Sequence, residues 1–202
     1  MAAEHSILNA RAEAWLTEYR RGHTEALGPL VEQTRRPLFG FILNMTEGRG
    51  DAEEIFQETW YRTLRHVDRV DGRRVMSWLF RVAHNLIVDR ARRKKPMESL
   101  NQTAQDEAPG RTALEDRLPA PGLSPAGETA GRDLGHRLRQ AIGQLPPEQR
   151  EVFLLRVEGD VPFREIAEMQ DVSINTALAR MQYALAKLRN ELREEYAVWA
   201  EG

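Results

Sequence analysis

Apolar residues recur along both halves of the chain at intervals of three and four, the spacing of one face of an α-helix. No segment alternates apolar and polar residues with the period of two that a half-buried strand requires, so we predict an all-α fold. The predicted helices cover residues 7–22, 24–46, a segment that begins at Asp51, 76–95, 134–145, 146–157, 162–170 and 173–195.

Turn and cap residues predict where three of these helices begin. Asp51 ends the glycine-containing run EGRGD and can cap its helix, Pro147 suits a first helical turn, and Ser173 can cap the last helix. The last helix is expected to bury one apolar stripe, which consists of Ile174, Ala177, Met181, Leu185, Leu188 and Leu192.

Residues 97–132 interrupt the helical pattern. They contain no Ile, Val, Phe, Trp or Tyr and are rich in Pro, Gly, Ala and acidic residues, so they cannot bury enough apolar surface to offset chain entropy. We therefore predict two small helical domains, residues 1–96 and 133–202, joined by a flexible linker. The alternative is a long functional loop within one domain, although structureless loops of this length are uncommon in compact domains.

Charge is unevenly distributed along the chain. Residues 1–96 hold 17 Lys and Arg against 13 Asp and Glu, whereas the rest of the chain holds 12 against 18, and the formal net charge is −2. A basic first domain favours an anionic partner more than the overall balance suggests.

The absent residue types exclude several classes of function. The chain has no cysteine, so it forms no disulfide, thiolate metal site or cysteine nucleophile, which fits a reducing compartment. It shows no signal-peptide pattern and no long apolar stretch, so we expect a cytoplasmic protein. The five histidines lack metal-ligand spacing and no glycine-rich phosphate loop occurs, so we expect neither an enzyme nor a cofactor.

The segment 162–189 has the proportions of a helix-turn-helix, in which the second helix places its first turns in the major groove of DNA. Asp171 stands in the turn where a glycine would be easier to accommodate. A small and polar face opposite the apolar stripe could approach base edges, and two flanking residues could bind phosphates. The face comprises Asn175, Ala179, Gln182, Tyr183 and Ala186, and the flanking residues are Thr176 and Arg180. A helical hairpin with a solvated face is the alternative.

The segment 76–95 carries two different faces. Its apolar arc consists of Leu79, Ala83, Leu86 and Ile87 together with Arg90, and the second face, within about 60°, consists of Trp78, Arg81, Asn85, Asp89 and Arg92. The second face suits single-stranded nucleic acid, because an indole can stack on a base, an amide can contact a base edge and guanidinium groups can neutralise phosphates. The basic run of Arg90, Arg92, Arg93, Lys94 and Lys95 extends it. Alternatively, Trp78 belongs to the core, and Asn85 and Asp89 make local hydrogen bonds.

Taken in order, three runs resemble the extracytoplasmic-function (ECF) group of bacterial sigma factors, the promoter-recognition subunits of RNA polymerase. The runs are DAEEIFQETW (51–60), WLFRVAHNLIVDRARR (78–93) and the long segment 145–189 that begins LPPEQREVFLLRV. The resemblance covers about residues 24–96 and 134–190, and the order and spacing of the runs are more specific than any one of them.

The resemblance implies three contacts. The run after Asp51 would dock on core RNA polymerase through Asp51, Glu54, Gln57 and Glu58. The loop 67–76 and Asn85 would form the pocket that captures a base flipped from the non-template strand of the −10 element, with Trp78, Arg81, Asp89, Arg92 and Arg93 also on the DNA. The helix 173–189 would bind the duplex −35 element. The implied partners are core polymerase, promoter DNA and a dedicated anti-sigma factor, without any membrane contact.

Two positions depart from the family pattern. Asn175 stands where members usually carry glycine, and Leu178 stands where they usually carry a basic residue, so one phosphate contact is expected to be missing. The predicted helix 7–22 has no clear family counterpart. The competing hypothesis is an ordinary transcriptional regulator, which would explain the helix-turn-helix but not Trp78, Asn85 or the acidic run after Asp51.

Overall fold

A computed structural model describes the backbone of residues 2–101 and 125–193, and the side chains of residues 11–93 and 134–193. Within this part of the chain every regular element is helical and no strand occurs, which confirms the all-α prediction. The elements are α1 (Ala2–Arg20), η1 (Thr24–Ala26), α2 (Leu27–Met45), α3 (Arg49–Arg65), η2 (Val67–Arg69), η3 (Gly72–Arg74), α4 (Val75–Asn101), α5 (Pro125–Gly143), α6 (Pro147–Val157), α7 (Phe163–Met169) and α8 (Ile174–Glu191). None of the described helices is long and apolar enough to cross a membrane.

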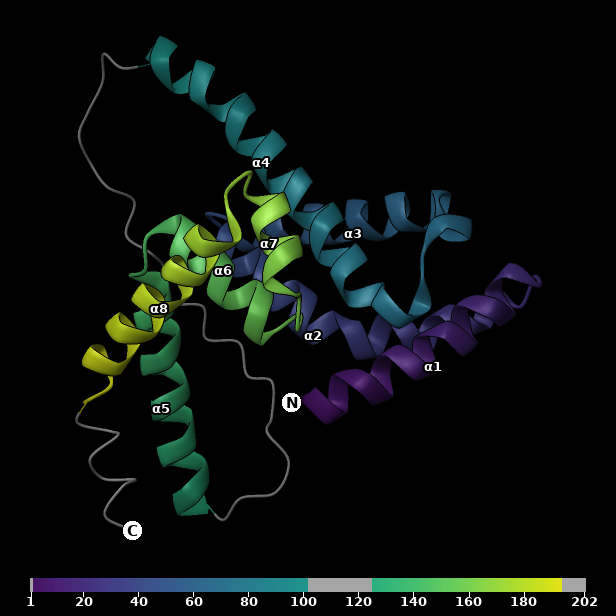
Figure 1. Cartoon of the computed structure of the whole chain (residues 1–202), viewed down its shortest axis with the longest axis horizontal. Helices are drawn as coiled ribbons and strands as arrows, with labels where there is room; N and C mark the ends of the chain where they lie inside the picture. The colour runs from purple at the N-terminus through teal and green to yellow at the C-terminus, as the bar shows by residue number, and fades with distance from the viewer. Residues whose placement is uncertain (1, 102–124, 194–202) are drawn as a thin grey trace.

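The helices α2, α3 and α4 pack against one another as one bundle, and α1 lies along α2 on its outer side (Figure 1). The apolar positions of α2 recur at three- and four-residue intervals, and Leu30, Leu38 and Phe41 are fully buried. Ala12 and Leu16 of α1 are also fully buried, so α1 is part of the core of the first domain.

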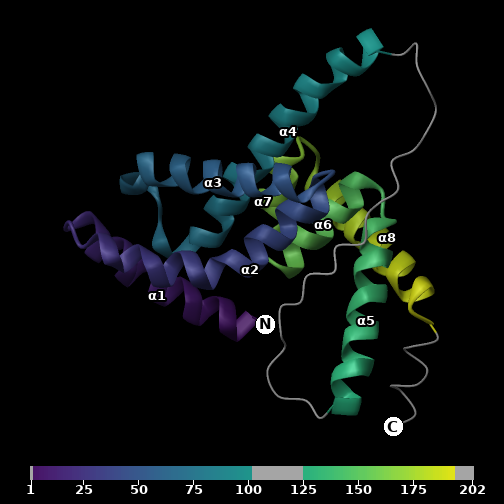
Figure 2. The same ribbon diagram turned by 180° about the vertical axis from the view of Figure 1, so that it is seen from behind.

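The helices α5 to α8 form the second bundle, in which α8 packs against α5, α6 and α7 (Figure 2). The α6 helix begins with Pro147 in its first turn, as predicted, and its residues Val152 and Leu155 are fully buried. The N-terminus of α8 is capped by Ser173, whose hydroxyl accepts a hydrogen bond from the Thr176 amide at 3.1 Å, which confirms the predicted cap.

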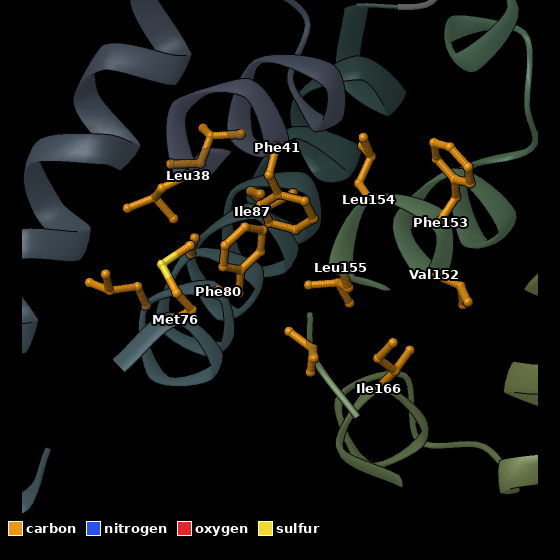
Figure 3. Close-up of a cluster of buried hydrophobic side chains, with 14 of the residues drawn as sticks. Leu38, Phe41, Met76, Phe80, Ile87, Val152, Phe153, Leu154, Leu155 and Ile166 are labelled. Atoms are coloured by element: carbon orange, nitrogen blue, oxygen red, sulfur yellow. The ribbon is translucent and has the colours of Figure 1, made fainter. Parts of the chain in front are cut away.

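The two bundles share one continuous hydrophobic core. Phe41 and Phe80 of the first bundle lie with ring centroids 5.0 Å apart and face Leu154 and Leu155 of α6 (Figure 3). Gly159, which follows α6, lies so close to the Phe80 ring that a Cβ atom there would be 3.2 Å from Cδ2 of Phe80. The two bundles are therefore closed onto each other through α2 and α4 on one side and α6 and α7 on the other.

One local prediction is wrong and another is right only in part. The third helix begins at Arg49 with Gly48 as its N-cap residue, so Asp51 lies inside the first turn and does not cap.

The apolar stripe predicted for α8 is confirmed at Ala177 and Leu188, which are buried, and at Met181, which packs against the core. It is wrong at Ile174 and Leu185, which are 47% and 41% exposed, and Ala184 is buried instead.

The proposed linker remains a prediction. Helix α4 continues to Asn101 and α5 begins at Pro125, so both enter the predicted 97–132 segment, and residues 102–124 lie outside the described residues.

Candidate nucleic-acid and polymerase interface

The second face of α4 lies where the helical spacing predicts. Leu79 and Ala83 are fully buried against α2 and α3, so the residues on the other side of the helix face outward. Asn85, Asp89 and Arg92 on that side are exposed. Arg93 is exposed as well, whereas Lys94 and Lys95 lie outside the residues whose side chains are described. The described face can therefore present an amide, a carboxylate and guanidinium groups to a strand.

Trp78 and Arg81, on the first turns of the same face, are half-buried. Trp78 packs against the hydrophobic core, as the alternative interpretation expected, and Arg81 is paired with acidic residues of α7. Between the two bundles lies an open cavity of about 550 Å³. Its wall on the first bundle consists of Arg69, Asp71, Arg74, Ser77, Trp78 and Arg81, and its wall on the second consists of Pro162, Arg164, Glu165 and Glu168. The predicted strand-capturing loop and the start of the α4 face thus line one cavity.

Acidic side chains of α7 occupy the basic side of this cavity. Arg74 forms an ion pair with Glu165, and Arg81 lies 3.3 Å from the Glu168 carboxylate and 3.9 Å from that of Glu165. In the closed arrangement, Arg74 and Arg81 are therefore paired with carboxylates of the second bundle.

A chain of hydrogen bonds runs from α4 to the recognition helix. The His84 Nδ1–H donates to Glu151 Oε1 at 2.6 Å, and Gln170 Nε2 donates to the other Glu151 oxygen at 2.7 Å. Gln170 in turn accepts a hydrogen bond from Arg180 Nη1 at 2.6 Å. The side chains of His84 and Glu151 are each only 9% exposed, so this contact between the bundles is buried.

Arg150 makes a second polar contact between the bundles. It donates to the Asn44 carbonyl at the end of α2 at 3.0 Å, and to the Gly143 and Leu145 carbonyls within its own bundle at 2.5 and 2.9 Å. Sequence reasoning missed His84, Glu151 and Arg150. Each is far in sequence from its partner in the other bundle, so no spacing rule could have paired them.

The helix-turn-helix consists of α7, a tight turn and α8. Asp171 has a φ of 51°, the left-handed conformation that glycine adopts more easily, as its position in the turn predicted. Of the predicted recognition residues, Asn175, Thr176 and Gln182 are exposed, Tyr183 is 63% exposed, and Ala179 is half-buried. Arg180 is half-buried and bonded to Gln170, which anchors it at the edge of this face.

The acidic residues predicted to bind polymerase divide into two groups. Asp51 and Glu54 both bind Arg90, with oxygen-to-nitrogen distances of 2.5 and 2.8 Å, and so connect α3 to α4. The hydrogen bond that Arg90 donates to Glu54, with smaller contributions from Asp51, raises the pKa of Arg90 against the lowering effect of its burial. Arg90 is therefore engaged inside the domain and does not continue the basic run.

Gln57 and Glu58 lie on the outer side of α3. Gln57 is exposed, and Glu58 is half-exposed and accepts a hydrogen bond from Arg62 at 2.7 Å, one turn away on the same helix. These two side chains, together with the outer edge of Glu54, form the part of the predicted docking surface that a partner can reach.

Comparisons with known proteins place these features in a family. Residues 30–96 match Sigma-70 region 2 and residues 135–188 match Sigma-70, region 4. The chain is 26% identical over 181 residues to the ECF RNA polymerase sigma factor SigW of Bacillus subtilis, covering 89% of this chain and 95% of SigW.

Two solved structures share the fold. The sigma factor RpoE in complex with the anti-sigma factor NepR, from Bartonella quintana, aligns with a TM-score of 0.60 at 18% identity, over 81% of this chain and 94% of the other. CnrH in complex with the cytosolic domain of CnrY aligns with a TM-score of 0.56 at 20% identity, over 91% and 98%. With both sigma regions present in order, the chain belongs to the ECF sigma factors, which direct promoter-specific transcription initiation.

Proposed function

We propose that this sigma factor works through three surfaces: the outer side of α3 binds core polymerase, the α4 face and the preceding loop capture the unpaired −10 strand, and α8 contacts the duplex −35 element. The observation that supports this best is the alignment of Trp78, Arg81 and Asn85 on one face of α4, beside a cavity and opposite a buried core. The protein performs no bond chemistry itself, since polymerase supplies the catalysis, and it acts where polymerase is, in the cytoplasm.

Strand capture makes promoter opening favourable in this proposal. Each base that stacks on an aromatic side chain or hydrogen-bonds in a pocket offsets the few kcal/mol that its unstacking costs. The arginines on the same face neutralise phosphates, so binding should weaken as salt rises.

The two DNA contacts require the bundles to separate. About 25 base pairs lie between the −35 and −10 elements, which is about 85 Å at 3.4 Å per step. The bundles are in direct contact in the closed structure, with α7 across the cavity from Trp78 and paired with Arg81. The 36 residues of 97–132 would extend to about 120 Å if the ends of α4 and α5 that enter this segment unwound, and the linker would then allow both contacts at once.

We further propose that the closed arrangement is an inactive form and that a dedicated anti-sigma factor holds it. The two solved relatives are described in complexes with NepR and CnrY, an anti-sigma factor and a cytosolic domain. The acidic side chains of Glu165 and Glu168 on the strand-binding arginines support this reading. Self-inhibition by residues 1–22 is disfavoured because Ala12 and Leu16 are core residues, so that segment is not a removable cover.

Run-off transcription with core polymerase on genomic fragments tests the function and recovers a promoter in the same experiment. Permanganate footprinting of unpaired thymines on that promoter then tests strand capture. Asn85→Ala should lower the thymine reactivity while polymerase still co-purifies with the protein. The matched control is Asn190→Ala, an exposed amide at the end of α8. Normal reactivity with Asn85→Ala would remove Asn85 from the capture site.

The remaining alternative is an ordinary regulator that uses only the helix-turn-helix. A pull-down on core polymerase distinguishes the two, because a regulator of that kind has no reason to bind through α3. Absence of binding by the wild-type chain would favour the regulator.

A further inference from the structure

The loop between α3 and α4, residues 66–74, exposes most of its side chains, while its backbone contacts α1. We call it the capture loop. It consists of two short 3-10 turns, η2 and η3, and its Asp71 carboxylate accepts a hydrogen bond from the Arg73 amide at 3.0 Å. Only Val70 and Gly72 are buried. A loop that displays charged side chains outward needs support from behind, and here the support comes from α1.

Arg20, at the end of α1, binds the backbone of the capture loop. Its guanidinium donates to the Val67 carbonyl at 2.8 Å and to the Val70 carbonyl at 2.5 Å, through the same nitrogen. These carbonyls bracket η2, so one side chain fixes both ends of that turn. Charge-assisted hydrogen bonds of this kind are stronger than neutral ones.

The backbone of α1 also packs directly on the capture loop. A Cβ atom at Gly72 would lie 2.7 Å from the Glu13 backbone nitrogen and closer still to the Glu13 Cα, so only glycine fits there. The neighbouring Ala12 and Leu16 are fully buried, which fixes α1 against the domain. The capture loop is therefore supported by α1 in addition to the hydrogen bonds within the loop.

We propose that α1 positions the capture loop for base selection, with Arg20 and Gly72 as positioning residues. The proposal rests on the assignment of strand capture to this loop and to α4. Arg69, Asp71 and Arg74 of the loop lie beside Trp78 on the wall that the first bundle supplies to the cavity. This wall stays on the first bundle when the bundles separate, so the placement of these side chains would decide which base fits. A loop ordered before binding loses less conformational entropy on binding and discriminates better. Helix α1 precedes the segment that matches Sigma-70 region 2, which begins at residue 30.

The test uses holoenzyme reconstituted with Arg20→Ala, Arg20→Lys or Gly72→Ala. The probe is a fork-junction DNA from a promoter recovered by run-off selection, with the −10 strand single-stranded and each of the four bases placed in turn at the captured position. The matched control is Arg21→Ala, because Arg21 is exposed and its guanidinium binds Glu18 at 2.8 Å, away from the capture loop. Polymerase assembly and thermal unfolding are measured for every variant.

Arg20→Ala should weaken binding of the preferred probe about tenfold, and the preference among the four bases should flatten. Arg20→Lys should regain part of the binding and part of the base preference, since the lysine ammonium can still donate to the two carbonyls. Gly72→Ala should weaken binding and flatten the base preference as Arg20→Ala does. Arg21→Ala should behave as wild type.

Unchanged base preference in Arg20→Ala would overturn the positioning role, and a parallel loss of polymerase assembly and strand binding would do the same by showing a general folding defect. If Asn85→Ala is impaired while Arg20→Ala is normal, strand capture stands and the α1 support fails. If Asn85→Ala and Arg20→Ala both behave as wild type, the assignment of strand capture to this site is wrong, and with it the positioning role that rests on it.

Discussion

The buried contact between His84 and Glu151 gives the sharpest test of the closed arrangement. The perturbation is a double-mutant cycle of His84→Ala, Glu151→Ala and the double variant. The two side chains lie 67 positions apart in the chain, on α4 and α6, and make a hydrogen bond of 2.6 Å. They can interact only when the bundles are closed, so their coupling energy reports closure itself.

The expected magnitude follows from burial and charge. A hydrogen bond to a charged group contributes about 1.5–3 kcal/mol net, and here both side chains are 9% exposed, so solvent screens them little. Removing Glu151 also frees the Gln170 amide, but that loss occurs in the single and the double variants and cancels in the cycle. We therefore expect a coupling energy of about 2 kcal/mol.

Equilibrium unfolding in urea, followed by circular dichroism, measures the free energy of each variant. Wild type should unfold in one cooperative transition, since the bundles share a core. The control cycle pairs His84 with Glu148, an exposed residue in the first turn of α6, and should show no coupling. A His84–Glu151 coupling below about 0.5 kcal/mol would refute closure in solution.

Three further predictions concern the working surfaces. Glu58→Lys or Gln57→Ala should reduce co-purification with core polymerase without changing thermal stability. The control is Glu53→Lys, at a residue paired with Arg49, which should leave co-purification unchanged, and equal recovery of all three variants would place the docking surface elsewhere. Arg180→Ala should weaken −35 binding almost equally across sequences and lower the salt dependence of binding by about one phosphate contact, while Gln182→Ala or Tyr183→Ala should change the preferred bases in a binding selection. Unchanged base preferences in all three variants would exclude this face of α8 as the surface that contacts the −35 bases. Ser173→Ala should cost about 1 kcal/mol of unfolding free energy because it removes the α8 cap, and an unchanged urea midpoint would contradict the cap's contribution.

Helical periodicity predicted the fold class and most of the helices, because each bundle buries one regular stripe per helix. On α8 the prediction was right for Ala177, Met181 and Leu188 but wrong for Ile174 and Leu185, because hydrophobicity favoured these two over Ala184. Close packing of α8 against α5, α6 and α7 explains the difference, since an alanine lets helices approach where a larger side chain would not.

The sequence predicted which residues form the candidate site, but it did not predict which residues of other helices contact them. The α4 face follows from 100° spacing, and Asn85 and Asp89 are exposed on it. Two features of the site depend on contacts between distant segments: the pairing of Arg74 and Arg81 with the acidic residues of α7, and the binding of Asp51 and Glu54 to Arg90. Such contacts cannot be predicted from one sequence by local patterns, because the residues next to an acidic side chain do not show whether a distant arginine binds it.

Because α4 is continuous, it fixes the distance between the side chains along its exposed face. The helix is unbroken from Trp78 to Arg92, a rise of about 21 Å at 1.5 Å per residue, which equals about six nucleotide steps of 3.4 Å. A strand bound along this face, as proposed above, would meet the indole of Trp78 and the guanidinium of Arg92 at a fixed interval, because a helix does not stretch. A single residue inserted between Trp78 and Arg92 would rotate the C-terminal part of α4 by about 100° about the helix axis and turn Arg92 away from the proposed strand.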